Sequence, residues 1–229
     1  MAFPQFDPRP GRGDPQSDSH GPGLAWVPPA MLEACRSASL LLGGPALSRL
    51  GITSALREEG RTSVALAFAR VQREDLGRSV LLLDLDLENP GLARQHGLDG
   101  WPGVAEVLRG ERSLEQVLQP VSDGILMISP GAVADGGART ASDLAASGFV
   151  AEASRYADVV IGDLPPQLGP GPGLAAARAF DRLLLVVRAG VTPTARIREA
   201  VADLPVTPSV LLNGSHSSMP GWARRLLGR

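Results

Sequence analysis

The fold of this chain is decided between residues 50 and 90, where the sequence reads LGITSALREEGRTSVALAFARVQREDLGRSVLLLDLDLENP. A short apolar segment, residues 48–54, leads into a polar loop. The Ala- and Leu-rich stretch Ser63–Gln72 follows, with its larger apolar side chains on one side, as in a helix packed on a sheet. The continuous apolar run Ser79–Leu85 is typical of a buried parallel strand. The stretch therefore predicts a strand, a loop, a helix and a second strand.

The loop between the first strand and the helix has features of a phosphate-binding loop. In such loops backbone N–H groups surround an anion, a lysine contacts the phosphates and a hydroxyl binds Mg²⁺. Gly60 stands where the backbone must approach the phosphates, and Thr62, followed by Ser63, can supply the hydroxyl. Arg61 occupies the lysine position, although its wide planar fork does not replace a compact ammonium without rearrangement. Glu58 is expected to place a carboxylate where the anion would lie, so the loop predicts weakened nucleotide binding.

Other interpretations of these loop residues stay open. The chain contains no lysine, so all 22 basic residues are Arg, and a general replacement of Lys by Arg would also produce Arg61 in a working loop. Glu58 and Glu59 can equally form a solvated charge pair that faces no ligand. Arg61 can also pair with either glutamate, in which case it is less free to reach a phosphate.

Acids follow the apolar strands. Asp84 and Asp86 lie at the end of the run described above, and Asp163 ends another apolar segment, residues 157–162. In open α/β sheets ligands bind outside the carboxyl ends of the strands. The cleft is therefore expected at the carboxyl ends of the strands at Gly51–Thr53, Val80–Asp84 and Val159–Asp163.

The rest of the chain alternates strand and helix patterns. This alternation predicts a doubly wound α/β fold with a mostly parallel sheet and helices on both faces. Further strands are expected at Ile125–Ser129, Ala157–Gly162, Arg182–Arg188 and Ser209–Leu212. Further helices are expected at Met31–Leu42, Gly103–Leu108, Ser113–Leu118, Ser142–Tyr156, Leu174–Phe180, Thr192–Leu204 and Pro220–Leu227.

Composition bounds the domain organisation and the location. A chain of 229 residues with 44% hydrophobic residues suits one α/β domain, expected over residues 29–229. Residues 1–28 are rich in Pro, Gly, Asp and Ser, so we expect a disordered tail that can be deleted with little loss of stability. The net charge of −2 gives no sign of nucleic-acid binding. A single cysteine, Cys35, and apolar runs too short to span a bilayer predict a soluble, cytoplasmic protein.

Several segments, taken in order, resemble the ATPase domain of bacterial tyrosine kinases of the capsule-synthesis (CpsD/CapB) type. These kinases belong to the MinD/ParA group of deviant P-loop ATPases. The resemblance covers about residues 31–215. Besides the phosphate loop, the matching segments are LLLDLDLENPGL (81–92), PGVAEVLRGERSLEQVLQP (102–120), DVVIGDLPP (158–166), LLLVVRAGVTP (183–193) and VLLNG (210–214).

The resemblance implies an ATP and Mg²⁺ site and assigns its residues. The candidate phosphate, nucleotide and cation residues are Gly60, Arg61, Thr62 and Ser63; the Walker A′ acids are Asp84 and Asp86, the Walker B acid is Asp163, and Asn213 lies on the adenine side. Within this set Asp84, Asp86 and Asp163 are the candidate catalytic residues, and Thr62, Asp84 and Asp163 the candidate metal ligands. The family's loop usually reads Pro-Gly-Glu-Gly-Lys before the Ser or Thr, so Arg57, Glu58 and Arg61 depart from it.

Two further features bear on activity and assembly. In the family a Glu-x₂-Arg-x₂-Arg pattern helps to build a ring oligomer, and here Glu33 and Arg36 match it while Ser39 replaces the second Arg. The family's tyrosine-rich C-terminal tail is not matched, since the only tyrosine is Tyr156. A self-phosphorylating kinase is therefore not expected.

We expect a regulatory or assembly component of exopolysaccharide or capsule synthesis and export, with weak or absent ATP hydrolysis. Its expected partner is a membrane-associated export or chain-length protein, which would bring it to the inner face of the membrane, and a homo-oligomer through the Glu33/Arg36 helix is a further possibility. The alternative is an active MinD/ParA-type ATPase, or a protein tyrosine kinase acting on another protein, with Arg in place of the loop lysine.

Overall fold

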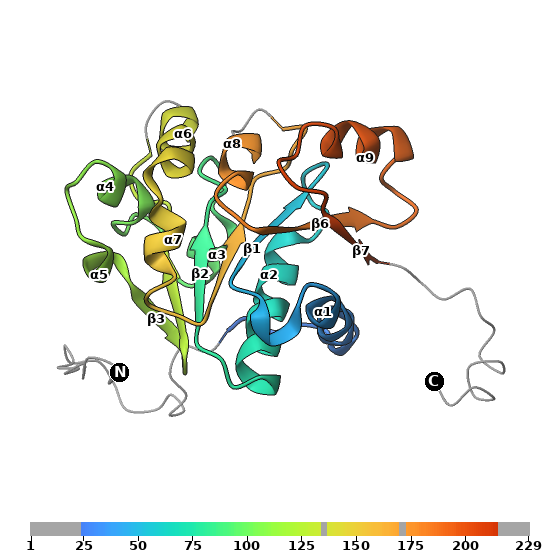
Figure 1. The fold of residues 1–229 in the computed structure, drawn as a ribbon, viewed down its shortest axis with the longest axis horizontal. Coiled ribbons are helices and arrows are strands. Elements are labelled where there is room, and N and C mark those ends of the chain that lie inside the picture. Colours follow the sequence, from blue (N-terminus) through green and yellow to red (C-terminus); the bar gives the residue numbers. More distant parts are fainter. Residues whose placement is uncertain (1–23, 134–136, 170–172, 215–229) are drawn as a thin grey trace.

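A computed structural model describes residues 24–133, 137–169 and 173–214. Its centre is a seven-stranded sheet with the order β3-β4-β2-β5-β1-β6-β7 (Figure 1). All neighbouring strands run parallel except β3 and β4. The strands are β1 Arg49–Ser54, β2 Val80–Asp84, β3 Gln119–Ser122, β4 Ile125–Ile128, β5 Val159–Asp163, β6 Arg182–Arg188 and β7 Ser209–Asn213. The predicted doubly wound, mostly parallel α/β fold is confirmed.

Helices cover both faces of the sheet. In the described part of the chain they are α1 Pro29–Leu41, α2 Arg61–Arg70, α3 Gly91–Gln95, α4 Val104–Leu108, α5 Leu114–Val117, α6 Ala138–Ser147, α7 Phe149–Ala153, α8 Gly173–Ala177 and α9 Thr194–Val201. A 3₁₀ turn, Gly44–Ala46, precedes β1, and a π-helical turn, Val71–Asp75, extends α2. One face carries α1 and α2, and the other carries α4, α6, α7 and α8 (Figure 1).

The continuous apolar run of β2 is explained by this double cover. All five residues of β2 are buried. Alternate side chains of a strand point to opposite faces, so Val80 and Leu82 join the core beneath α1 and α2, while Leu81 and Leu83 join the core on the other face. A strand with two apolar faces leaves no polar alternation in the sequence.

The structure differs from the predicted elements in three places. Strand β3 was not predicted, because it is a short edge strand whose sequence, QPVS, contains Pro120, a residue that sheets accept at an edge. The five-residue helix α3 was also missed. The single helix predicted at Ser142–Tyr156 is wrong: α6 and α7 are separate because Gly148, with a φ of 72°, ends one and begins the other.

The N-terminal boundary of the folded part lies before residue 28. Val27 is only 3% exposed and belongs to the core beneath α1 and α2, where Leu24 and Ala25 also pack. The boundary predicted for the tail is therefore too late, since it leaves a core residue in the tail. Residues 1–23, and the helix predicted at Pro220–Leu227, lie outside the described residues.

Helix α1 packs on α2 with Cys35 and Ser39 buried. The Ser39 hydroxyl accepts a hydrogen bond from Nε2 of Gln72 at 2.8 Å. Arg36 lies on the outer side, where it pairs with Asp75 at 2.6 Å and with Glu33 at 3.4 Å. The position at which the family pattern has its second Arg is therefore part of the helix–helix contact.

Candidate functional site

The candidate site lies where the carboxyl ends of β1, β2 and β5 meet. Strand β5 pairs with β1 on one side and with β2 on the other. Asp84 and Asp163 are direct partners in the register of β2 and β5, so the two acids end neighbouring strands at the same edge of the sheet. The structure thus brings these acids together at the edge where the cleft was predicted.

The loop between β1 and α2 requires a glycine at residue 60. Gly60 precedes α2 with a φ of 94°, a conformation that residues with a Cβ rarely adopt. A Cβ at this position would lie 2.2 Å from Nδ2 of Asn213. That nitrogen donates a hydrogen bond to the backbone carbonyl of Glu59 at 2.9 Å. Asn213, which the resemblance assigns to the adenine side, holds the loop backbone in this structure.

The two glutamates of the loop have different environments. Glu59 is 2% exposed, and its carboxylate accepts hydrogen bonds from the backbone N–H groups of Leu56 at 2.9 Å and Arg188 at 3.3 Å, and from the hydroxyl of Thr192. The interpretation of Glu59 as a solvated charge is therefore wrong, because its side chain ties the loop to the end of β6. Glu58 is exposed, which fits a solvated charge better than a carboxylate enclosed by the loop.

The backbone of Glu58 is strained. Its φ of 63° makes it the only residue other than glycine with a positive φ among the described residues. A left-handed conformation costs a residue with a Cβ about 1–2 kcal/mol, and glycine adopts it freely. The family's Pro-Gly-Glu-Gly-Lys loop has glycine at this position, so the substitution by Glu acts against the local backbone geometry.

Arg61 is held by two groups of the protein. Its Nη2 lies 3.0 Å from Oδ2 of Asp86, and its Nη1 donates a hydrogen bond to the carbonyl oxygen of Leu164. The side chains of Arg61 and Asp86 are 9% and 4% exposed. Nη1 of Arg57, whose side chain is 38% exposed, lies 3.6 Å from the same Asp86 oxygen. Pairing of Arg61 with Glu58 or Glu59, one of the alternatives above, is therefore not what the structure has.

Asp84 and Asp163 each have one oxygen bound by the protein. The hydroxyl of Thr62 donates to Oδ2 of Asp163 at 2.6 Å, and the backbone N–H of Ala93 donates to Oδ2 of Asp84 at 2.8 Å. The Oδ1 atoms of both acids are buried and have no hydrogen-bond partner among the described residues. Ser63, the remaining candidate for nucleotide binding, is exposed in the first turn of α2.

Burial controls the charge state of this acid pair. Burial raises the pKa of Asp163 to about 6, against the lowering effects of the Arg61 charge and the Thr62 hydroxyl. Burial and then the charge of Asp163 raise the pKa of Asp84 well above its usual range. Buried carboxylate oxygens without partners are costly unless they bind a proton or a cation.

The oxygen atoms of Thr62, Asp84 and Asp163 suit a hard divalent cation better than the loop suits a triphosphate. Hydroxyl and carboxylate oxygens are the ligands that Mg²⁺ prefers, and Mg²⁺ usually binds through one or two carboxylates together with waters and phosphates. No group of three or more His, Cys, Asp or Glu side chains forms a metal site by itself in the described part of the chain. On the phosphate side, Arg61 would have to leave both Asp86 and Leu164 to contact an anion.

Two backbone contributions to the site were not predicted from the sequence. Helix α3 supplies the N–H that binds Asp84, and its first residue, Gly91, lies against Thr62: a Cβ on Gly91 would come within 2.9 Å of the hydroxyl oxygen. The second backbone contribution is the carbonyl oxygen of Leu164, which accepts a hydrogen bond from Arg61. For the close approach of α3 to Thr62, the only indication in the sequence is Gly91 itself, within the segment LENPGL.

Comparison with known proteins gives the family. No family model matches the chain. The chain is 30% identical over 162 residues to the tyrosine-protein kinase YwqD of Bacillus subtilis. The aligned region covers 70% of this chain and 68% of YwqD. The chain is also 30% identical over 188 residues to the succinoglycan biosynthesis transport protein ExoP of Rhizobium meliloti, with 79% of this chain covered but only 24% of ExoP.

Solved structures agree with this result. The kinase domain of VpsO superimposes with a TM-score of 0.72 at 26% identity, covering 82% of this chain and 95% of that domain. Cobyrinic acid a,c-diamide synthase from Mycobacterium smegmatis, with bound ADP and magnesium, has a TM-score of 0.57 at 21% identity over 80% of each chain, a likeness of fold alone. None of the helices in the described part of this chain has the length and apolar character of a membrane span. By its sequence and its fold, the chain belongs to the bacterial tyrosine-protein kinase family.

Proposed function

We propose that this chain is a regulatory or assembly component of exopolysaccharide synthesis and export whose phosphate loop hydrolyses ATP weakly or not at all. The observation that carries the proposal is the position of Arg61. Phosphoryl transfer depends on positioning and on neutralising charge as it develops on the phosphoryl oxygens. A guanidinium that is buried against Asp86 and Leu164 supplies neither to a nucleotide unless both contacts break.

The cation side of the pocket supports weakened rather than abolished binding. Thr62, Asp84 and Asp163 are the residues that would hold Mg²⁺ with a bound nucleotide. Held by these residues, the ion would supply the positive charge that offsets the negative charge of a nucleotide's phosphates. The protein's own residues then have defined tasks: Ala93 orients the Asp84 carboxylate, Thr62 orients Asp163, and Asn213 keeps the loop against β7.

The polysaccharide context rests on the relatives. ExoP is named as a succinoglycan transport protein, and this chain corresponds to about a quarter of its length. On this basis we propose that the chain acts beside a membrane-associated export or chain-length protein, at the inner face of the membrane. Helix α1 is the candidate surface for self-assembly, because the side chains of Glu33 and Arg36 are 72% and 43% exposed.

Nucleotide binding and hydrolysis test this proposal directly. The melting temperature is measured with and without ATP and Mg²⁺, and phosphate release is measured for the natural chain, for Glu58→Gly/Arg61→Lys and for the surface control Arg49→Lys. The natural chain and the control should show little stabilisation and little phosphate release. The double variant should gain in both, because glycine relaxes the loop and an ammonium reaches a phosphate without the planar fork.

One observation favours the alternative, an active ATPase with an adapted loop. The unpartnered Oδ1 atoms of Asp84 and Asp163 are the features of a working cation site. Turnover by the natural chain equal to that of a purified active family member, with no gain in the double variant, would replace our proposal with this alternative.

A further inference from the structure

The buried carboxylate of Glu59 joins two loops at the carboxyl ends of the strands. Its Oε2 accepts a hydrogen bond from the backbone N–H of Leu56 at 2.9 Å, within the phosphate loop. Its Oε1 accepts hydrogen bonds from the backbone N–H of Arg188 at 3.3 Å and from the hydroxyl of Thr192. Arg188 ends β6, and Thr192 lies in the turn between β6 and α9. One side chain therefore holds the phosphate loop to this turn.

Only one of the three donors to Glu59 is a side chain. Glu59 is 2% exposed, and none of the ion pairs among the described residues includes it. A buried carboxylate without a cation depends on the hydrogen bonds that its neighbours donate. The donors from Leu56 and Arg188 are backbone N–H groups, which a substitution leaves in place. The hydroxyl of Thr192 is therefore the one donor that depends on the identity of a side chain.

The turn after β6 fixes the position of Thr192. The N–H groups of Val191 and Thr192 both donate to the carbonyl oxygen of Arg188, at 3.1 Å and 3.0 Å. Gly190, with a φ of 73°, has the left-handed conformation that glycine adopts without strain. The turn is thus closed by its own hydrogen bonds, and it places the Thr192 hydroxyl on Glu59.

A second set of hydrogen bonds joins the same segments through β7. The N–H of Ala189 donates to the carbonyl oxygen of Asn213 at 2.9 Å, and Nδ2 of Asn213 donates to the carbonyl oxygen of Glu59 at 2.9 Å. The bonds form a closed circuit through the phosphate loop, the turn after β6 and the end of β7. Asn213 is the candidate residue for the adenine side, and Gly60 is a candidate for the phosphates. The circuit therefore joins the two candidate sides of the pocket.

We propose that Thr192 is a positioning residue for nucleotide binding, which acts on the phosphate loop through the carboxylate of Glu59. Its hydroxyl keeps the loop against the turn after β6, so the two sides of the pocket are arranged before a nucleotide binds. Such preorganisation matters because the apparent Kd rises as the fraction of molecules in the binding conformation falls. The inference rests on the proposal that this pocket binds a nucleotide, and it does not depend on hydrolysis.

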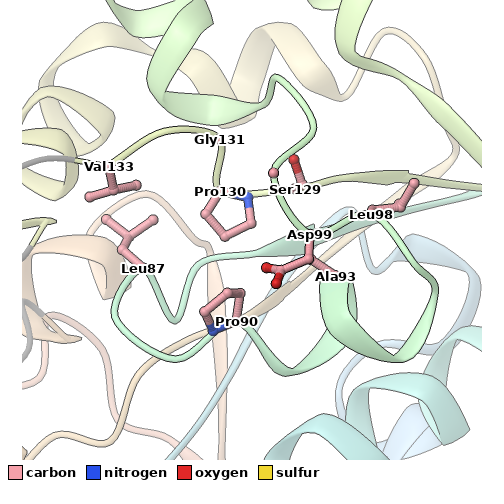
Figure 2. Close-up of a pocket in the computed structure, with 10 residues that line it drawn as sticks. Leu87, Pro90, Ala93, Leu98, Asp99, Ser129, Pro130, Gly131 and Val133 are labelled. Carbon is pink, nitrogen blue, oxygen red and sulfur yellow. The ribbon is translucent and has the colours of Figure 1, made fainter.

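The contacts of Glu59 lie in the part of the sheet that is formed by β1, β6 and β7. A hollow between the segment after β2, helix α3 and the loop after β4 opens on the other side of β5 (Figure 2). None of the residues in the Glu59 contacts lines that hollow, whereas Gly100 and Gly131 do. The amides of these two glycines therefore report on a general disturbance of the fold, separately from the phosphate loop.

Thr192→Val removes the hydroxyl and keeps the shape of the side chain, and NMR of the ¹⁵N-labelled full chain measures the result. Without ligand, the variant should shift the amides of Leu56 and Gly60 and leave those of the two reference glycines unchanged. In a titration with ADP and Mg²⁺, the substitution should raise the Kd about fivefold, as expected for loss of one hydrogen bond to a charged acceptor. The titration is run with Thr192→Val in the natural chain and in Glu58→Gly/Arg61→Lys.

Three control variants separate positioning from a general loss of stability. Thr192→Ser keeps the hydroxyl and should have the Kd of the chain without the substitution. Thr207→Val makes the same chemical change at an exposed position and should leave the Kd unchanged. Glu59→Gln replaces one carboxylate oxygen by an NH₂ group, which cannot accept a hydrogen bond from a backbone N–H. In that background Thr192→Val should change the Kd by less than about twofold, because the two side chains act through the same contact.

The outcomes decide the proposal in either chain. An unchanged Kd in Thr192→Val, an equal effect of Thr207→Val, or additive effects of Thr192→Val and Glu59→Gln would overturn it. So would the absence of measurable ADP binding in both the natural chain and the double loop variant. Failure of the proposed function has a different signature: ATP turnover by the natural chain at the rate of an active family member refutes that function, and the change in Kd expected for Thr192→Val stays the same.

Discussion

Removal of the Arg61 guanidinium should destabilise the fold even without nucleotide. In Arg61→Met the side chain keeps much of its length but loses its charge and its donors. The carbonyl of Leu164 then loses its donor, and the carboxylate of Asp86, which is only 4% exposed, loses its closest cation. Taking one partner from a buried ion pair usually costs about 3–5 kcal/mol, because the other charge is left behind.

Arg57 lowers the expected cost. At 3.6 Å from Asp86, with its side chain 38% exposed, it partly replaces the lost cation. We therefore expect a loss of about 2–3 kcal/mol in the free energy of unfolding. For a chain of this length, about 2–4 °C per kcal/mol converts this loss to a fall of roughly 4–12 °C in melting temperature.

Urea unfolding followed by circular dichroism measures this loss, and Arg49→Met is the matched control. Arg49 makes two hydrogen bonds to Asp181, both at 2.7 Å, but the two side chains are 30% and 47% exposed. Exposed pairs contribute about 1 kcal/mol or less. A loss in Arg61→Met no larger than the loss in Arg49→Met would refute the account of Arg61 as a buried, engaged cation.

Three further predictions concern the loop, the acids and the N-terminus. Glu58→Gly should raise the free energy of unfolding in urea by about 0.5–1 kcal/mol, because the strain energy relieved at the positive φ exceeds the entropic cost of ordering a glycine. An unchanged or lower stability would show that the Glu58 backbone is not strained. Between about pH 3.8 and pH 6 the folded chain keeps a proton on Asp163 that the unfolded chain has released, so stability falls as the pH rises. Asp163→Asn should reduce that fall by about 2–3 kcal/mol between pH 4 and pH 7, and parallel pH profiles of the two proteins would contradict the raised pKa. A chain beginning at Leu24 should have the melting temperature of the full chain. A chain beginning at Pro29 should melt about 4–8 °C lower, because it lacks the buried Val27. Equal melting temperatures of the two truncated chains would show that Val27 contributes nothing to stability.

The sequence predicts the apolar strands of the sheet better than the polar edge strand β3. Strands β2, β5 and β6 are apolar runs because both of their faces are covered, and a run of that kind is visible in the sequence alone. Edge strand β3 is polar and contains a proline, so neither periodicity nor propensity marks it. A glycine in a helical pattern leaves open whether the helix continues, and at Gly148 the left-handed conformation decides against continuation.

Candidate acids could be placed from the sequence, but their partners could not. Asp84 and Asp163 follow from the rule that ligands bind at the carboxyl ends of parallel strands. The contacts of Arg61 join residues 25 and 103 positions away, and the contact of Glu59 with Arg188 spans 129 positions. Nothing local specifies such pairs, because the distances depend on how the strands are ordered in the sheet.

The two departures in the loop have different physical origins. The absence of lysine from the whole chain is enough to account for the identity of Arg61, but it does not account for its contacts. Those contacts need a planar fork that places one nitrogen on Asp86 and another on Leu164, an arrangement that suits a guanidinium and not an ammonium. Glu58 owes nothing to the choice between lysine and arginine, and it sits in a conformation that glycine would adopt at lower cost. The phosphate loop therefore carries two independent substitutions, Arg61 and Glu58, and the second opposes local stability. The acids at the strand ends, Asp84 and Asp163, in contrast remain paired in register. This contrast favours altered phosphate chemistry over a neutral drift in composition.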